Sequence, residues 1–289
     1  MSVDSILEKV KQLREITGVG FKDCKSAIDE TKGDIEKSIE LLRKKGIAKA
    51  SKRMERVAAE GLICTYENNN NFSMIEINSE TDFVAKNNEF INFVEEVCKM
   101  AFLNHGDIDK ILNSEMENKK TTKTNLDDLI SKIGEKITLR RSSFFGGDNC
   151  INFSYIHSAF KKNVGKLGVL LSLETKIDKN EILNFGKQLS MHIAASSPLA
   201  IDKENLDQKM LEKEKEIIKE ELKSSGKDIK IIEKIALGKL NKFVADNTLL
   251  NQEWIMEPKK KVKDVINEIS KKNKIKVKNF IRFKVGEGL

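Results

Sequence analysis

A pattern of two strands followed by a helix occurs twice in this sequence. Two strand-like segments, LICTY and FSMIEI, are separated by four asparagines at 68–71 and followed by a helical segment that begins NEFINF at residue 88. From Cys150 the same order returns as INFSYIH, GVLLSLET and a helical segment that begins NEILNF at residue 180. Apolar residues recur at matching offsets in the two helical segments: Phe90, Phe93, Val97 and Ala101 in the first, and Ile182, Phe185, Leu189 and Ile193 in the second. This duplication predicts a core of two similar α+β subdomains.

The two copies differ in the connection from the second strand to the helix. Each copy has Glu-Thr at the end of the strand, at residues 80–81 and 174–175, but eight residues lead from that Glu to the shared Asn in the first copy and six in the second. The first connection is therefore two residues longer, with the apolar pair Phe83-Val84, or a neighbouring pair, as the surplus. Because the second copy closes its core without such a pair, the first core does not need Phe83 and Val84 to close, which favours a role other than core packing for them. The alternative is that Phe83 is a core side chain.

Residues 4–45 have the periodicity of three short helices, with breaks at TGVG (17–20) and TKGD (31–34). Asp34 is a candidate cap for the third helix and Gly46 a candidate end. We predict a compact three-helix domain over 1–46 and a basic, partly helical linker over 47–59. The TGVG stretch either exposes Val19 beside Phe21 as a small binding patch or only connects two helices.

Residues 204–250 are highly charged and carry two narrow apolar stripes, with a turn near 223–228. They predict an antiparallel helical hairpin that projects as a coiled-coil arm or forms a dimer contact. Later segments, KKKVKDVINEISKKNK and IKVKNFIRFKVGEGL, have the patterns of a helix and a strand that complete the second copy. The core subdomains are therefore predicted at 60–148 and at 149–203 with 251–289.

Composition and charge narrow the classes of function. No apolar run approaches the roughly 20 residues needed to span a bilayer, and the first residues lack the order of a signal peptide, so we expect a cytoplasmic protein without a membrane partner. The net charge is +7, but it is unevenly spread: residues 1–56 carry 14 Lys and Arg against 10 Asp and Glu, and residues 57–113 carry 3 against 10. Most basic residues are Lys, with few aromatic neighbours, so direct nucleic-acid binding is not expected.

The sequence offers no obvious catalytic or metal centre. The four cysteines form no C-x-x-C pair, which argues against a zinc site and fits buried thiols. Phosphate-loop, dinucleotide and zinc-protease motifs are absent, and Gly146-Gly147 is most simply a turn. Of the three histidines, His105 and His157 lie at predicted element ends, whereas a structural or partner-facing role is favoured over catalysis for His192. We therefore expect no enzyme, no cofactor and no metal.

Four segments carry a resemblance to a known family. LREITGVGFKDCKSAIDETKGDIEKSIELLRKKG, SETDFVAKNNEF, MHIAASSP and FIRFKVGEG lie in the order and at about the spacing found in bacterial elongation factor Ts, and the matches cover most of the chain. The first segment resembles the ubiquitin-associated-like N-terminal domain of that family. Many members continue past VGEG into a further C-terminal helix, whereas this sequence ends at Leu289, so a contact made by that helix is not expected here.

The resemblance implies a guanine-nucleotide exchange factor for the GTPase elongation factor Tu. In the family, the T-D-F-V loop enters the GTPase domain near its magnesium site and displaces Mg²⁺, a role that falls here on Thr81, Asp82, Phe83 and Val84. Other implied partner contacts are Leu13, Val19, Phe21, Lys22 and His192. This sequence has Phe21-Lys22 where many relatives carry paired methionines.

Two other classes of function stay open at the sequence level. The first is a ubiquitin-associated-type adaptor, in which the N-terminal module binds the partner and the T-D-F-V loop is incidental. The second is a basic RNA-binding protein, whose binding should weaken steeply with salt. The charged arm also leaves room for a homodimer.

Overall fold

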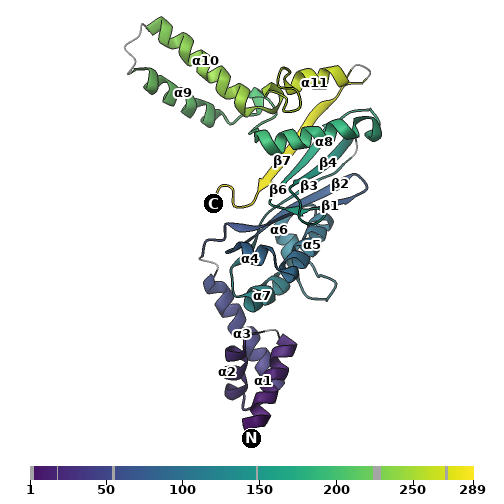
Figure 1. The fold of residues 1–289 in the computed structure, drawn as a ribbon, viewed down its shortest axis with the longest axis vertical. Coiled ribbons are helices and arrows are strands. Elements are labelled where there is room, and N and C mark those ends of the chain that lie inside the picture. Colours follow the sequence, from purple (N-terminus) through teal and green to yellow (C-terminus); the bar gives the residue numbers. More distant parts are fainter. Residues whose placement is uncertain (1–2, 18, 54–55, 148, 224–228, 271–272) are drawn as a thin grey trace.

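The structure, a computed structural model, describes residues 3–17, 19–53, 56–147, 149–223, 229–270 and 273–289. The molecule is elongated, with a three-helix module at one end, two sheets in the middle and a helical hairpin at the other end (Figure 1). The element order mixes helices with antiparallel sheets, so the predicted α+β class is confirmed.

The N-terminal module consists of α1 (Val3–Thr17), α2 (Phe21–Glu30) and α3 (Ile35–Arg53), as the apolar periodicity predicts. Its small core is fully or almost fully buried and comprises Val10, Leu13, Cys24, Ala27, Ile28 and Leu42. Asp34 begins α3 as predicted, since its carboxylate accepts a hydrogen bond from the Lys37 amide at 3.0 Å.

Gly46 does not end the third helix, contrary to the sequence prediction, because α3 continues to Arg53. A Cβ atom placed on Gly46 would lie 2.6 Å from Oγ of Ser131 on helix α7 (Thr122–Ile133). The glycine therefore permits a close approach between α3 and the first core subdomain. The three-helix module is joined to the core through this helix contact.

The first sheet has the strand order β3-β2-β1-β5, and its neighbouring strands are antiparallel. The strands are β1 (Glu60–Asn68), β2 (Asn71–Ser79), β3 (Ile137–Phe145) and the short β5 (Val164–Gly165). The β1–β2 hairpin closes through Asn69 and Asn70, both with positive φ, which is the backbone of a tight hairpin turn. Helices α5 (Asn88–Leu103), α6 (Ile108–Asn113) and α7 cover its outer face (Figure 1).

The second sheet has the order β4-β6-β7 and is also antiparallel. Its strands are β4 (Cys150–His157), β6 (Leu167–Glu174) and β7 (Lys276–Lys284), and its covering helices are α8 (Lys179–Ser196) and α11 (Val262–Ile269). The chain thus returns to the sheet after the arm, as predicted. All eight apolar positions that defined the repeated helix are buried in the two structural copies.

The paired strands revise the alignment of the two copies. The β2–β3 register shifts between Glu76 and Ile77, and the β6–β7 register shifts between Ser172 and Leu173, so Ile77 corresponds to Leu173. Asn88 follows Ile77 by eleven positions and Asn180 follows Leu173 by seven. The first connection is therefore four residues longer, not two, and four residues is the length of the extra helix α4 (Asp82–Ala85).

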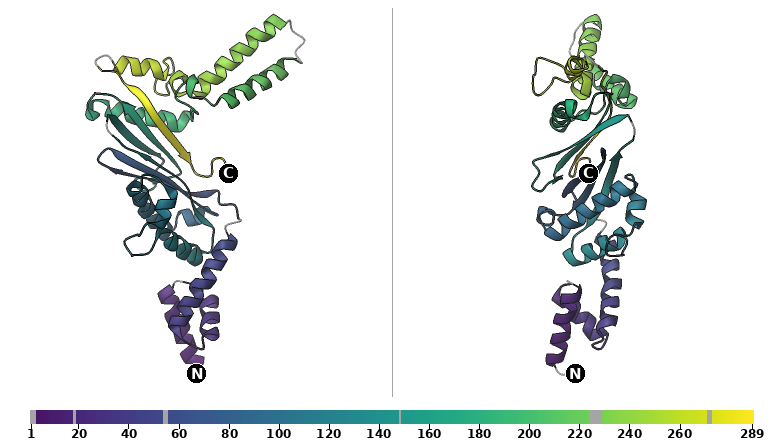
Figure 2. Two further views of the ribbon diagram at one scale, coloured as in Figure 1. Left: turned by 180° about the vertical axis from the view of Figure 1, so that it is seen from behind. Right: turned by 90° about the vertical axis from the view of Figure 1, so that its right-hand side faces the viewer.

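The two sheets stack face to face, with the helices on the outside (Figure 2). Apolar side chains from both sheets meet in a cluster between them, made of Ile63, Phe72, Met74, Phe145, Leu170 and Phe283. Each sheet therefore contributes one face to its own helix-covered core and the other face to this shared layer.

The arm is a hairpin of α9 (Gln208–Lys223) and α10 (Ile229–Asn247), which projects from the second sheet's end of the molecule (Figure 1). The α9 stripe is buried at Leu211, Ile218 and Leu222, and Phe243 of α10 is half-buried. The predicted turn at 223–228 lies largely outside the described residues. A homodimer through the arm stays a prediction.

Candidate functional site

The loop from Glu80 to Asn87 presents a large apolar side chain to solvent. Phe83 is 79% exposed, the largest fraction among the bulky apolar side chains that the structure describes. It lies on the single turn α4, whose N-cap residue is Thr81. An aromatic ring at this exposure gains little free energy from the fold of the free protein, so almost all of its apolar surface is still available for burial.

Val84 points the other way. It is 6% exposed and packs in the first core with Ala85, Phe90 and Ile91. Successive residues of a helical turn point about 100° apart, so one turn can present Phe83 outward and bury its neighbour. The interpretation of the whole pair as partner-facing is therefore wrong for Val84, which anchors the turn instead.

Hydrogen bonds to the two residues that precede β3 hold the base of this turn. Thr81 donates its amide to Oε2 of Glu135 at 3.0 Å and its hydroxyl to Oε1 at 2.8 Å. In the opposite direction, Oε1 of Glu80 accepts the amide of Lys136 at 2.6 Å. Each of the two chain segments therefore contributes a carboxylate that accepts a backbone amide of the other segment. These charge-assisted hydrogen bonds fix the backbone that carries Phe83.

Two further contacts complete the loop. Arg56, at the end of the N-terminal linker, pairs with Glu80 at 3.3 Å. The ammonium of Lys86, the C-cap residue of α4, lies 2.7 Å from the carboxylate of Asp82, and this hydrogen bond lowers the pKa of Asp82. Asp82 therefore forms an exposed ion pair with the residue at the end of its own turn, whereas Glu80 links the turn to the segment that follows α3.

Replacing Glu135 with alanine tests this brace directly. Thr81 would lose the acceptor for both of its donors, and hydrogen bonds to charged groups contribute about 1.5–3 kcal/mol each. We expect amide hydrogen exchange over residues 81–87 to accelerate by at least about tenfold. Glu95→Ala removes an exposed ion pair with Lys161 and is the matched control. Unchanged exchange in Glu135→Ala would contradict the brace.

The predicted contact residues of the N-terminal module divide into exposed and buried groups. Phe21 is 44% exposed at the start of α2, and Lys22 beside it is exposed. Val19 is half-buried and packs partly on the module's core. Leu13 is fully buried in that core. Direct contact through the side chain of Leu13 is therefore ruled out in this conformation, and its place is to support the helices that carry Phe21.

His192 is fully buried as well, so a partner-facing imidazole is also wrong in this conformation. Its Nε2 lies 3.0 Å from Oε1 of Gln252, its Nδ1 accepts the amide of Ile255 at 3.4 Å, and its ring stacks on Trp254. These partners specify a neutral imidazole with the proton on Nε2. The residue joins α8 to the segment that leaves the arm.

The burial of His192 predicts a pH dependence of stability. Burial lowers the pKa of His192 below its ordinary value of 6.5, so the unfolded chain binds a proton at a pH where the folded chain does not. We expect the free energy of unfolding to fall as the pH drops below about 6.5, with a slope of at most about 1.4 kcal/mol per pH unit from this residue.

Denaturant unfolding between pH 7.5 and 5.5 measures this slope. His192→Gln should flatten it. An identical slope in His192→Gln and the native protein would show that His192 is not the responsible group.

The predicted site residues are not gathered at one point. Thr81, Asp82 and Phe83 share one turn in the middle of the molecule, whereas α2 lies in the terminal module and α8 in the second half (Figure 1). The role of Glu135 was not predicted from the sequence, because a carboxylate 54 positions from its partner leaves no local pattern.

Among the described residues, no group of three or more His, Cys, Asp or Glu side chains is placed to hold a metal ion. Three of the four thiols, those of Cys24, Cys64 and Cys98, are buried, as expected from their spacing. In the same part of the chain, no helix has the length and apolar character needed to cross a membrane.

Comparisons with known proteins cover nearly the whole length of the chain. A family model described as Elongation factor TS matches residues 80–287. A protein named Elongation factor Ts from Bartonella tribocorum is 41% identical over 97% of this chain and 92% of its own length. Proteins of the same name from Clostridium botulinum and Gluconobacter oxydans are 40% and 38% identical, over 98% and 97% of this chain and 93% and 91% of theirs.

Proposed function

The chain belongs to the elongation factor Ts family of translation elongation factors, and we propose that it promotes the release of GDP from elongation factor Tu. In this proposal it acts in the cytoplasm and is not an enzyme, because it changes the rate at which a nucleotide dissociates without making or breaking a covalent bond. The observation that carries the proposal is the exposed Phe83 on a turn braced by Glu135.

The exposed ring suits the opening of a pocket in a GTPase. Phe83 gains burial only where the partner offers an apolar pocket, so its binding free energy is coupled to the partner conformation in which that pocket is open. In the proposal this pocket lies near the Mg²⁺ that joins GDP to elongation factor Tu. Displacing the ion removes much of the electrostatic attraction that holds the phosphates.

The loop residues have separate parts in this mechanism. Phe83 enters the pocket, Thr81 holds the turn through Glu135, and Val84 fixes the turn to the first core. Asp82, exposed and paired with Lys86, is available to contact the partner beside Phe83. The displaced Mg²⁺ is bound by the partner, and no residue of this chain is proposed as its ligand.

The coupling must be reciprocal. The factor by which this protein lowers the affinity of elongation factor Tu for GDP is also the factor by which GDP lowers the affinity of elongation factor Tu for this protein. An incoming nucleotide can therefore release the factor, which alters rates without deciding which nucleotide elongation factor Tu finally holds.

The other contacts are proposed from exposure. Phe21 and Lys22, with the half-buried Val19, would form the contact made by the N-terminal module. Leu13 supports that contact from within, and His192 supports the partner-facing surface of the second half by fixing α8 to the base of the arm.

Release of a fluorescent GDP analogue from elongation factor Tu tests the proposal. The labelled complex is mixed with excess unlabelled GDP, with and without the native protein, and the loss of fluorescence is followed. Strong acceleration by the protein is expected. No acceleration would reject exchange activity and favour the adaptor hypothesis, which has its own observation in the exposed Leu7, Ile16 and Phe21 of the three-helix module.

A further inference from the structure

Glu76 is a fully buried carboxylate between the two sheets. Its neighbours in β2, Ile75 and Ile77, face the first core, so the alternation of a strand directs Glu76 to the opposite face, where the second sheet packs. An ionised side chain in such a position is tolerated only when its oxygens are paired.

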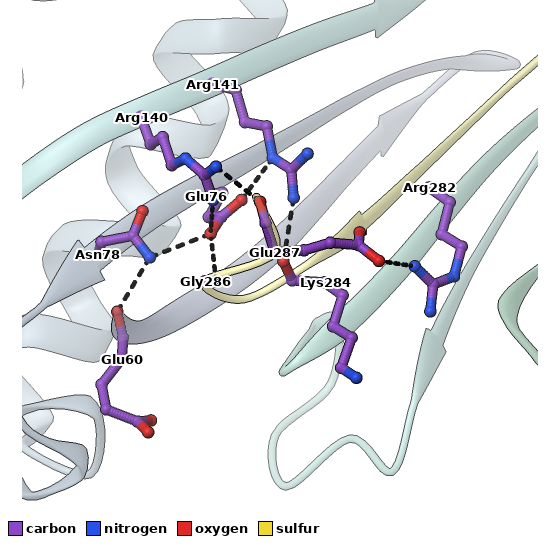
Figure 3. A network of polar contacts seen from close by, with 9 residues as sticks. All are labelled: Glu60, Glu76, Asn78, Arg140, Arg141, Arg282, Lys284, Gly286 and Glu287. Atoms are coloured by element: carbon purple, nitrogen blue, oxygen red, sulfur yellow. Dashed lines mark hydrogen bonds and ion pairs between the residues drawn. The ribbon is translucent and has the colours of Figure 1, made fainter. Parts of the chain in front are cut away.

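Four groups surround the carboxylate (Figure 3). Oε1 accepts from Arg140 at 3.2 Å, from the Asn78 amide side chain at 3.0 Å and from the backbone amide of Gly286 at 2.9 Å. Oε2 accepts from Nε of Arg141 at 2.5 Å. Both oxygens are thus satisfied, one of them by the chain segment that follows the second sheet.

The register shift between β2 and β3 places two arginines beside Glu76. Glu76 pairs with Arg141 and Ile77 pairs with Leu139, which leaves Arg140 as the extra residue of a bulge. Consecutive residues of a regular strand point to opposite faces, so without the bulge Arg140 and Arg141 could not both reach Glu76.

The same arginines bind the segment after β7. Arg141 donates to the carbonyl of Lys284 at 3.0 Å, and Arg140 donates to the carbonyl of Glu287 at 2.6 Å (Figure 3). Gly286 has φ of 75°, and a Cβ there would lie 2.3 Å from the carbonyl oxygen of Ala59, so this tight approach requires glycine. Glu76 therefore joins β2 and β3 of the first sheet to the end of the second.

The hydrogen bonds of Glu76 fix the relative orientation of the two sheets, which the apolar layer between them does not. The cluster of Ile63, Met74, Leu170 and Phe283 between the sheets is held by non-directional burial, which is compatible with small sliding movements. A buried carboxylate with four donors is satisfied in one arrangement only. Such groups contribute less to net stability than to selecting a unique geometry in several systems.

We propose that Glu76 is a positioning residue, which holds the two halves of the molecule in the relative orientation that lets both engage the GTPase at once. The inference rests on the proposed function, since it assigns Phe83 to one contact and the second half to another. Strand β2 carries Glu76 and leads directly into the turn that displays Phe83. A factor that contacts its partner through two surfaces binds with an affinity proportional to the fraction of molecules in which both surfaces are aligned.

The test compares Glu76→Gln with the native protein in two assays. Hydrogen exchange of the free protein reports on residues 284–289, and fluorescent GDP release from elongation factor Tu gives a half-saturating concentration and a maximal rate. We expect exchange at 284–289 to accelerate at least about tenfold and the half-saturating concentration to rise about tenfold. The maximal rate should stay within about twofold, because a bound factor still inserts Phe83.

Glu67→Gln is the matched control. Glu67 pairs with Lys179 at 3.5 Å and so also joins the two halves, but through an exposed ion pair, which contributes little. It should change neither assay. Arg140→Met is the second variant if Glu76→Gln does not fold by circular dichroism, since it keeps the pair of Glu76 and Arg141.

The outcomes distinguish a failure of the positioning role from a failure of the proposed function. A native half-saturating concentration in folded Glu76→Gln or Arg140→Met, with faster exchange at 284–289, overturns the positioning role and leaves the proposed function intact. A lower maximal rate at a native half-saturating concentration also overturns it. No acceleration by the native protein overturns the proposed function and this inference together.

Discussion

Phe83→Ala is expected to lower the acceleration of GDP release from elongation factor Tu by roughly 30- to 150-fold while leaving the fold unchanged. Burying a phenylalanine side chain contributes about 2–3 kcal/mol, and each 1.4 kcal/mol corresponds to a factor of ten. The free protein loses almost no packing, because the ring is 79% exposed. The loss therefore falls on the complex alone.

The measurement is the release rate of the fluorescent GDP analogue at equal concentrations of native and variant protein. Phe160→Ala is the matched control, since Phe160 is 54% exposed on the connection between β4 and β5 and lies outside the proposed loop. Equal acceleration by Phe83→Ala and native protein would keep the exchange function and remove Phe83 from its mechanism.

Gly61→Ala should cause the largest loss of stability among the changes considered, about 3 kcal/mol or more. Gly61 has φ of 138°, and a Cβ there would lie 2.1 Å from the carbonyl oxygen of Ile77 and 2.6 Å from Cα of Asn78. Both obstacles are backbone atoms of the paired strand, so no side-chain movement relieves them. The β1–β2 hairpin must distort or open.

Chemical denaturation followed by circular dichroism measures this effect. Gly238→Ala, in the interior of α10, is the control of opposite sign, since a Cβ there meets nothing within 4 Å and alanine favours helix by about 1 kcal/mol. A Gly61→Ala protein as stable as the native one would mean that the strand can shift at no cost.

The duplication made the core predictable from sequence. The same helical offsets occur twice, so each copy supports the assignment of the other, and every apolar position named for the repeated helix is buried. The connection before the helix was harder to align, because the Glu-Thr dipeptides match in letters but not in strand register. Only the pairing with β3 and β7 showed that the surplus is a whole turn.

The site was predictable in part, for a physical reason. Sequence comparison isolates an apolar pair but cannot tell which member a single helical turn directs outward, and the structure exposes Phe83 and buries Val84. The burial of His192 depends on Gln252, which is 60 positions away. Gly46 looked like a helix end because its role, a close approach to Ser131, is also a long-range one.

The partners of Glu76 were beyond sequence reasoning for the same reason. The alternation of FSMIEI places this carboxylate on the face opposite the first core, which in a lone hairpin would be solvated. The second sheet covers that face in the folded molecule, and Gly286 lies 210 positions from Glu76.

The order of the strands has a consequence for synthesis of the chain. The first sheet takes its three long strands from a continuous stretch that ends at Phe145, whereas β6 of the second sheet waits for β7, which begins only at Lys276 after the whole arm. On the ribosome, the first half can therefore fold while the second is still open, with its apolar sheet face uncovered. The arm is made during that interval, so a long-range pairing closes the molecule last.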